Sequence, residues 1–246
     1  MFSNRYIFIY ATILVVVIAG VLATTALFLQ PFQQRNIRIA KIQDILTSAS
    51  IESTRANAEE LFDRHIVEQR LINRHGDIVD DGRNPFDVEL RDELRRLQDL
   101  ERGRSTEEPA FPMFVSEING QRKYIVPVIG RGLWGPLWGY VALQGDFNTI
   151  AGVVFDHAGE TPGLGSQVAE SWFHQQFVGK RIFDDNDNFV SVRLMRGGAT
   201  NPHGVDALSG GTITGDGLSE TIQTSLENYV PYFRNQRRQQ QEQNID

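Results

Sequence analysis

The longest apolar run of the sequence lies near its N-terminal end. Residues 6 to 29, YIFIYATILVVVIAGVLATTALFL, contain no charged side chain. A helix of this length is long enough to cross roughly 30 Å of membrane hydrocarbon. A cleaved signal peptide and a buried core helix are the alternatives, but the run exceeds a signal h-region and has no clear A-x-A cleavage site. The pattern therefore predicts a transmembrane anchor over residues 1–30.

Residues 31–110 alternate between helical and strand periodicity. Ile37, Ile42, Ile45 and Leu46 recur near helical spacing, and Leu90, Leu94 and Leu97 form one apolar face among mixed charges. The charged face of the helix predicted over residues 87–102 is typical of a solvent-exposed face, and a docking surface is the alternative. We predict a membrane-proximal region with helices over 36–50, 55–65 and 87–102, and two short strands within 66–80 around the turn at residues 75–77.

Residues 111–234 are dominated by strand patterns. Asn119-Gly120 separates two apolar runs, which predicts a hairpin over 111–129. Further strands are expected near 139–144 and 149–155, a helix over 166–177, a second hairpin over 180–194, and a helix capped by Asp216. The fold class is therefore α+β, with an antiparallel sheet and flanking helices after the membrane helix. Residues 235–246 form a polar tail that we expect to be disordered.

Composition narrows the functional classes. The 246 residues carry a formal net charge of −7 and no cysteine, which argues against nucleic-acid binding and excludes disulfides and cysteine-ligated metals. The five histidines lack metal-ligand spacing, and Asp184–Asn188 lacks the remaining positions of an EF-hand loop. Neither a G-x-S-x-G elbow nor a P-loop is present. We therefore expect no catalytic residue and no metal site.

The stretch DALSGGTITGDG at residues 206–217 precedes the last predicted helix. Glycines permit close approach of backbone N–H groups to an anion, and a helix N-terminus favours negative charge. A glycine turn that merely caps the helix is the alternative interpretation of these local features. The pattern by itself leaves an anion site and a structural turn open.

Two segments together resemble a known family of FMN-binding domains. DALSGGT is similar to the motif in which a threonine carries flavin, and GETPGLG, residues 159–165, is similar to the companion loop. The resemblance implies that FMN is attached covalently through its phosphate to the Thr212 hydroxyl. Trp134 is expected either to contact flavin or to lie in the core. The candidate cofactor-binding residues are Thr212, Asp206, Ser209, Gly210, Gly211, Thr214, Glu160, Thr161, Pro162, Gly163, Leu164, Gly165, Leu133 and Trp134.

The segment from Gly130 to Gly165 and the single N-terminal span are similar to the family of C subunits of the sodium-translocating NADH:quinone reductases. That likeness implies an electron carrier between a membrane iron–sulfur centre and the FMN of the B subunit, supporting quinone reduction coupled to sodium export. The implied partners are the A, B, D, E and F subunits, the membrane, and a magnesium-dependent flavin transferase that uses FAD. Gly211 departs from the alanine usual in the motif, which removes a methyl group beside the acceptor.

The same likeness implies a single-pass protein of the bacterial inner membrane with its soluble domain in the periplasm. The charge count points weakly the other way, because Arg5 precedes the span whereas Arg35, Arg38 and Lys41 follow it. Two other functions remain open. One is the FMN-carrying G subunit of a ferredoxin:NAD oxidoreductase complex, and the other is a flavin-free, membrane-anchored adaptor.

Overall fold

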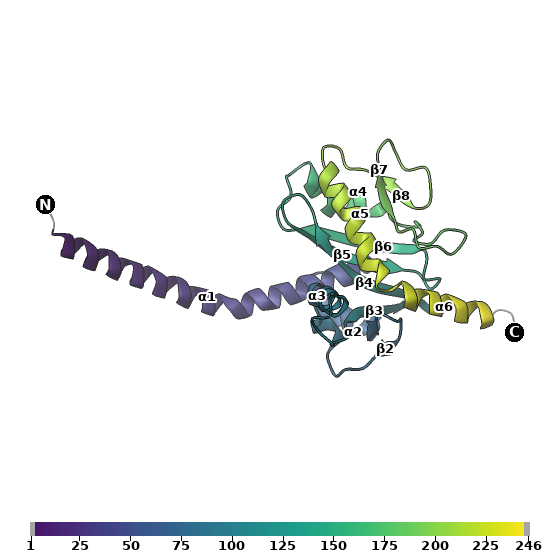
Figure 1. Cartoon of the computed structure of the whole chain (residues 1–246), viewed down its shortest axis with the longest axis horizontal. Coiled ribbons are helices and arrows are strands. Elements are labelled where there is room, and N and C mark those ends of the chain that lie inside the picture. Colours follow the sequence, from purple (N-terminus) through teal and green to yellow (C-terminus); the bar gives the residue numbers. More distant parts are fainter. Residues whose placement is uncertain (1–2, 244–246) are drawn as a thin grey trace. The chain divides into compact units, whose positions relative to one another are not determined.

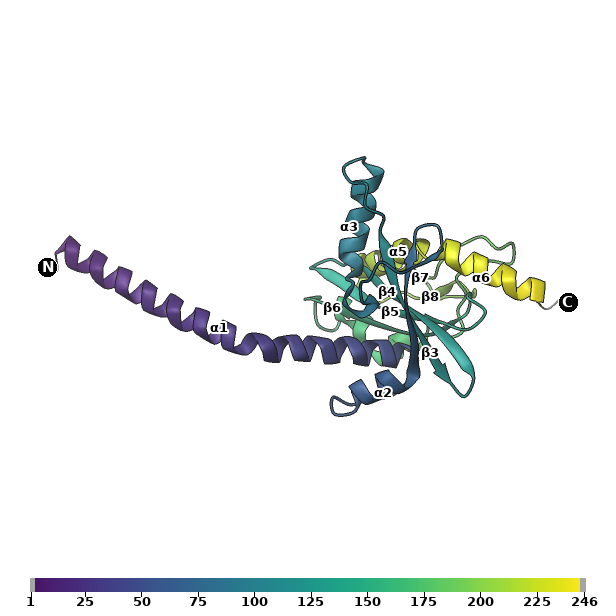
Figure 2. The same ribbon diagram turned by 90° about the horizontal axis from the view of Figure 1, so that it is seen from below.

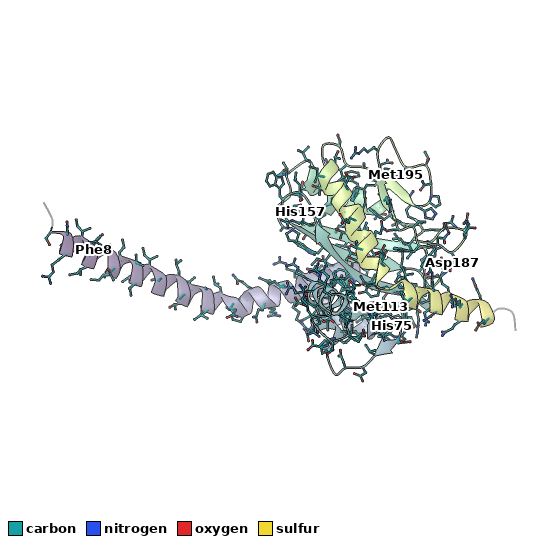
Figure 3. All side chains as sticks on the ribbon, in the orientation of Figure 1. Phe8, His75, Met113, His157, Asp187 and Met195 are labelled. Atoms are coloured by element: carbon teal, nitrogen blue, oxygen red, sulfur yellow. The ribbon has the colours of Figure 1, made fainter. Side chains whose placement is uncertain are left out.

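The structure of the chain, a computed structural model, describes residues 3–243 (Figure 1). The chain divides into two compact units, with the division between Ile42 and Gln43. Helix α1, Asn4–Ser48, is long and apolar enough to cross a membrane and takes in most of the predicted helix at 36–50. Its large apolar side chains up to Ile37, such as Phe8, are exposed (Figure 3), whereas Ile42, Ile45 and Leu46 near its C-terminal end are buried. This helix is consistent with a single N-terminal membrane anchor.

A six-stranded antiparallel sheet forms the centre of the second unit. The strands are β1 Ile66–Asn73, β2 Ile78–Val79, β3 Ala110–Ile118, β4 Gln121–Arg131, β5 Pro136–Leu143 and β6 Ile150–His157. The sheet order is β2-β1-β3-β4-β5-β6, so β2, β4, β5 and β6 each lie beside the strand that precedes them in the chain, whereas β3 lies beside β1. The predicted hairpin at Asn119-Gly120 is confirmed as the β3–β4 turn, and both turn residues have positive φ.

Helices cover both faces of this sheet, which explains why the central strands β3 and β5 are apolar almost throughout (Figure 2). On one face α5, Thr212–Glu227, packs mainly against β4, and α3, Leu90–Glu101, extends the same core. On the other face, Phe62 of α2, Ala58–His65, and Phe86 of the short helix η1, Pro85–Asp87, pack edge-on against Phe114 of β3.

The predicted helix at 166–177 is interrupted. A short helix η2, Gly165–Ala169, precedes α4, Ser171–Gln175, and Glu170 between them is extended with φ −81° and ψ 139°. The break follows the packing of both pieces on β6, because Val168 and Phe173 are each buried in the core.

The predicted second hairpin at 180–194 is wrong in its pairing. A single antiparallel bridge joins Phe183 to Phe189 around the turn at Asp184–Asn188. The following strand, β7 Arg193–Met195, instead pairs in parallel with β8, Gly204–Asp206. A glycine-containing loop separates β8 from β7 in the chain. The pairing of these two strands is therefore decided by the tertiary structure and not by a local turn.

The polar tail is helical rather than disordered up to Gln243, and residues 244–246 lie outside the described chain. Helix α6 runs from Val230 to Gln243. Tyr232 and Phe233 are buried at its start, and further along Arg237 pairs with Asp187 and lies 4.8 Å from the centroid of the Phe183 ring. These contacts with distant residues hold a segment whose composition alone does not favour order.

The predicted boundary at residues 110/111 falls within one sheet. Strand β1 pairs with β3 from Ile66↔Ser116 to Asn73↔Ala110, so the membrane-proximal region contributes strands to the same structure as the FMN-binding region. The described chain divides between Ile42 and Gln43, which is later than the predicted end of the anchor at residue 30 and earlier than the predicted boundary at residue 110.

A half-buried histidine links α4 to β6. His174 Nε2 lies 2.8 Å from the Val168 carbonyl oxygen and 3.1 Å from the Phe155 amide nitrogen. Burial lowers the pKa of His174 below its ordinary value of 6.5.

We expect the free energy of unfolding to fall as the pH drops below 6.5. Below pH 6.5 the unfolded chain binds a proton at His174, whereas the folded chain binds it only at lower pH because its pKa is lowered. The stability that is present above pH 6.5 is therefore lost as the pH falls through the lowered pKa of the folded state. Denaturant unfolding of the full chain in detergent, above and below that pH, measures the loss. His174→Gln should flatten the profile, whereas the exposed His75→Gln should not; equal profiles for both variants contradict the assignment.

Candidate functional site

The glycine-rich stretch forms the entry to α5. Gly210 has φ +70°, a conformation that glycine adopts without strain, and Gly211 is the N-cap residue. The first turn closes with the Gly215 amide donating to the Gly211 carbonyl at 2.8 Å. The helix therefore begins at Thr212, and the predicted cap at Asp216 is wrong. Asp216 lies in the second turn and pairs with Arg196 on the surface.

The first amides of α5 have no acceptor among the described residues. This applies to the backbone N–H groups of Thr212, Ile213 and Thr214, and no side chain caps the helix at Gly211. Such free amides, together with the helix dipole, favour an anion at this end of the helix. The donors present here suit a phosphate group.

Two threonines in this first turn differ in accessibility. Thr212 is exposed. Thr214 is only 2% exposed, and its Oγ1 donates a hydrogen bond of 2.6 Å to Glu160 Oε2. Of the two hydroxyls, that of Thr212 is therefore the one open to a modifying enzyme.

The Glu160 carboxylate joins three loops at this point. Glu160 is 5% exposed, and besides Thr214 it accepts a hydrogen bond of 3.0 Å from the Trp134 amide through Oε1. Its own backbone N–H donates to Nδ1 of His157, which lies at the end of β6 (Figure 3). A buried carboxylate needs such partners, and each of its oxygens has one.

Two glycines give this carboxylate its room. A methyl group at Gly132 would lie 2.3 Å from Glu160 Oε1. One at Gly165 would lie 2.6 Å from both Glu160 Oε2 and Thr214 Oγ1. Both distances are far below van der Waals contact, so the loops approach the carboxylate closely only because these positions lack a side chain.

The three loops enclose a pocket of about 200 Å³. Its rim carries exposed apolar side chains, including Ile213, which is 59% exposed. The pocket thus combines amide donors and hydroxyls at its base with an apolar rim. Its lining residues are Leu133, Glu160, Thr161, Leu164, Gly165, Gly210, Gly211, Thr212, Ile213 and Thr214.

Five of the candidate residues lie outside this lining. Asp206 ends β8 and accepts a hydrogen bond of 2.7 Å from the Ala199 amide, so it orders a neighbouring loop. Ser209, Pro162 and Gly163 are exposed. Trp134 contributes its amide to Glu160, but its side chain is 67% exposed and does not belong to the core.

Ile213 lines the pocket although sequence reasoning did not select it. Its signal was its position, since it lies between two candidate threonines at the start of a helix. A search for polar or reactive site residues does not select an aliphatic side chain such as Ile213. In the structure, this exposed isoleucine lies beside the pocket and offers an apolar contact surface.

Residues 132–227 match the family model of the FMN-binding domain. The match contains all three loops of the pocket and is shorter than the predicted range of 111–234. The chain is 33% identical over 216 residues to the C subunit of the Na⁺-translocating NADH-quinone reductase of Vibrio vulnificus, covering 82% of each protein. It is likewise 33% identical over 229 residues to the corresponding C subunit of Yersinia pestis, covering 86% of each.

Solved structures give the same result. The C subunit of the Na⁺-translocating NADH-quinone reductase from Parabacteroides distasonis aligns with a TM-score of 0.73 and 36% identity, covering 83% of this chain and 96% of that one. NqrC of Shewanella oneidensis aligns with a TM-score of 0.69 and 30% identity, covering 82% and 98%. The chain therefore belongs to the NqrC family, the C subunits of the Na⁺-translocating NADH-quinone reductases, which are oxidoreductase complexes, and carries its FMN-binding domain at residues 132–227.

Proposed function

We propose that this protein carries FMN attached covalently to Thr212 and serves as an electron-transfer subunit of the reductase. The observation that carries the proposal is the position of the Thr212 hydroxyl. It is exposed, lines the pocket of the FMN-binding domain, and lies in a helix turn whose amides lack acceptors among the described residues. The burial of Thr214 supports Thr212 over its neighbour as the acceptor.

Attachment is a phosphoryl transfer to a weak nucleophile. A bond forms between the Thr212 oxygen and the phosphorus of FMN, the diphosphate bond of FAD breaks, AMP leaves, and the hydroxyl proton is released. A threonine hydroxyl needs a base for such a step. The described residues that line the pocket include no lysine or histidine, and both oxygens of the Glu160 carboxylate already accept hydrogen bonds from Thr214 and Trp134. The transferring machinery therefore belongs to a separate flavin transferase, with Thr212 as its substrate.

The chain's own residues hold the cofactor in three ways. Thr212 would anchor the phosphate covalently, and the amides of the first turn of α5 would donate hydrogen bonds to its oxygens. Leu133, Leu164 and Ile213 offer apolar surface to the ring. When bound, FMN supplies reversible electron transfer, which no side chain of this protein provides.

Membership of the family supports a proposal for the place of the protein in the complex. We assign it to electron relay from an iron–sulfur centre in the membrane subunits to the FMN of the B subunit, within an assembly with the A, B, D, E and F subunits that couples quinone reduction to sodium export. The soluble domain lies in the periplasm of a bacterial inner-membrane protein, on the side of the flavin transferase. Relatives named as C subunits of the reductase support this assignment over the G subunit of a ferredoxin-linked complex.

The intact mass of the full chain purified from its native membrane tests the attachment. An added FMN that maps to the peptide containing Thr212 is the expected result. An unmodified Thr212 in native material contradicts it and favours the flavin-free adaptor.

Gly211→Ala, which restores the alanine usual in the motif, should leave attachment unchanged. A methyl group at this position would lie 3.2 Å from the Leu208 Cβ and 3.4 Å from the Gly165 backbone, contacts that a small shift of Leu208 relieves. We expect the stability to change by less than about 1 kcal/mol. Mass spectrometry measures the attached fraction, and a clear loss of flavin would mean that the pocket needs glycine here.

A further inference from the structure

We propose that Glu160 is the positioning residue of the attachment site, through the hydrogen bond that it accepts from Thr214. This inference rests on Thr212 as the acceptor. It assigns to Glu160 a role different from cofactor contact: its carboxylate fixes the first turn of α5 against the turn at 132–135, so that the Thr212 hydroxyl faces the pocket.

The contacts of the carboxylate support this role. One oxygen accepts from Thr214 Oγ1 at 2.6 Å and the other from the Trp134 amide at 3.0 Å. These donors belong to segments 80 residues apart in the chain, Trp134 and Thr214, and Glu160 joins them from a third segment. With an accepted bond on each oxygen, the carboxylate is held in one orientation.

The charge of Glu160 supports the same role. A carboxylate beside a helix N-terminus is stabilised by the helix dipole, and its hydrogen bonds are stronger than those of a neutral acceptor. The first turn of α5 otherwise has no side-chain cap and three amides without acceptors among the described residues. Thr214 is therefore the point at which this turn is fastened to the rest of the site.

The hydrogen bond also distinguishes the two threonines. It engages the proton of Thr214 with a buried acceptor, whereas Thr212, two residues earlier, projects outward. Side chains two positions apart on a helix do not share a face, so the bond that holds Thr214 against Glu160 leaves Thr212 exposed at the open side of the pocket. The selection of the acceptor thus follows from the Glu160–Thr214 pair.

The test compares Glu160→Gln, Thr214→Val and the double variant in the full chain, expressed with the flavin transferase. Each single variant should slow attachment by about tenfold, the factor expected for losing one hydrogen bond to a charged group. Glu160→Gln removes the charge and one of the two acceptor oxygens, and Thr214→Val removes the donor. Because both changes act on the same Glu160–Thr214 contact, the double variant should be little slower than the slower single variant. Thr224→Val is the matched control, because the hydroxyl of Thr224 on α5 donates to the Glu220 carbonyl, away from the site, and it should attach flavin at the normal rate.

Hydrogen exchange on the same variants without transferase provides a readout that does not depend on flavin. Exchange of the Gly215 amide, which donates to the Gly211 carbonyl and closes the first turn of α5, should accelerate in Glu160→Gln and Thr214→Val but not in Thr224→Val, with the core strands unchanged. Unchanged exchange in the first turn, or multiplied effects in the double variant, overturns the proposal. If Glu160→Gln does not fold, the attachment rate and the hydrogen exchange of Thr214→Val alone test the role of Glu160. Wild-type protein without flavin contradicts the proposed function instead, and the exchange result still decides the role of Glu160.

Discussion

Thr212→Val is expected to fold normally and to carry no covalently attached FMN. Valine has nearly the shape of threonine but lacks the hydroxyl oxygen that would form the bond to phosphorus. Thr212 is exposed and its side chain makes no hydrogen bond that the structure describes, so the folded state loses little. In-gel flavin fluorescence after denaturation, together with the intact mass of the full chain, measures the loss.

Thr212→Ser is the matched control, because it keeps the hydroxyl and should keep the flavin. Covalent flavin retained in Thr212→Val would contradict the assignment, and peptide mapping would then identify the true acceptor. Thr214 is disfavoured in that role by its burial and by its hydrogen bond to Glu160.

Gly217→Ala is expected to destabilise the domain, although it places a better helix former inside a helix. Helix propensity alone predicts a gain of up to about 1 kcal/mol. However, a methyl group at Gly217 would lie 2.3 Å from the Arg131 carbonyl oxygen, at the end of β4, where no flexible side chain can yield. Relieving this overlap moves α5 away from the sheet and costs about 1–3 kcal/mol. Thermal unfolding of the full chain in detergent, followed by near-UV circular dichroism, measures the change.

The displacement of α5 should also change the pocket, because Gly217 lies in the same first turns of α5 as the pocket residues Thr212 and Thr214. We therefore expect reduced flavin attachment in Gly217→Ala. Gly159→Ala is the control, since a methyl group there has no heavy atom within 4 Å. A stability equal to wild type in Gly217→Ala would mean that α5 and β4 separate without cost.

The motifs around the acceptor were predictable because their chemistry is local. The glycines before Thr212 indicated a helix entry able to bind an anion, and the structure brings the Glu160 and Thr212 loops together at one pocket. Sequence reasoning placed the helix start at Asp216 instead of Thr212. The error arose because Asp is a strong capping residue, whereas the positive φ of Gly210 and the closure at Gly211 are set by the packing of the loop against Leu164.

The sequence by itself determined the apolar helix near the N-terminus, the β3–β4 hairpin, the α+β class and the motif that contains the proposed acceptor Thr212. Each of these depends on residues adjacent in the chain, through an uncharged run, a turn dipeptide or a short motif. The tertiary structure decided the parallel β7–β8 pair, the helical order of the tail and the accessibility of Thr212 over Thr214. These features depend on contacts between distant segments, such as Arg237 with Asp187 and Thr214 with Glu160, whose free energy arises only when folding brings them together.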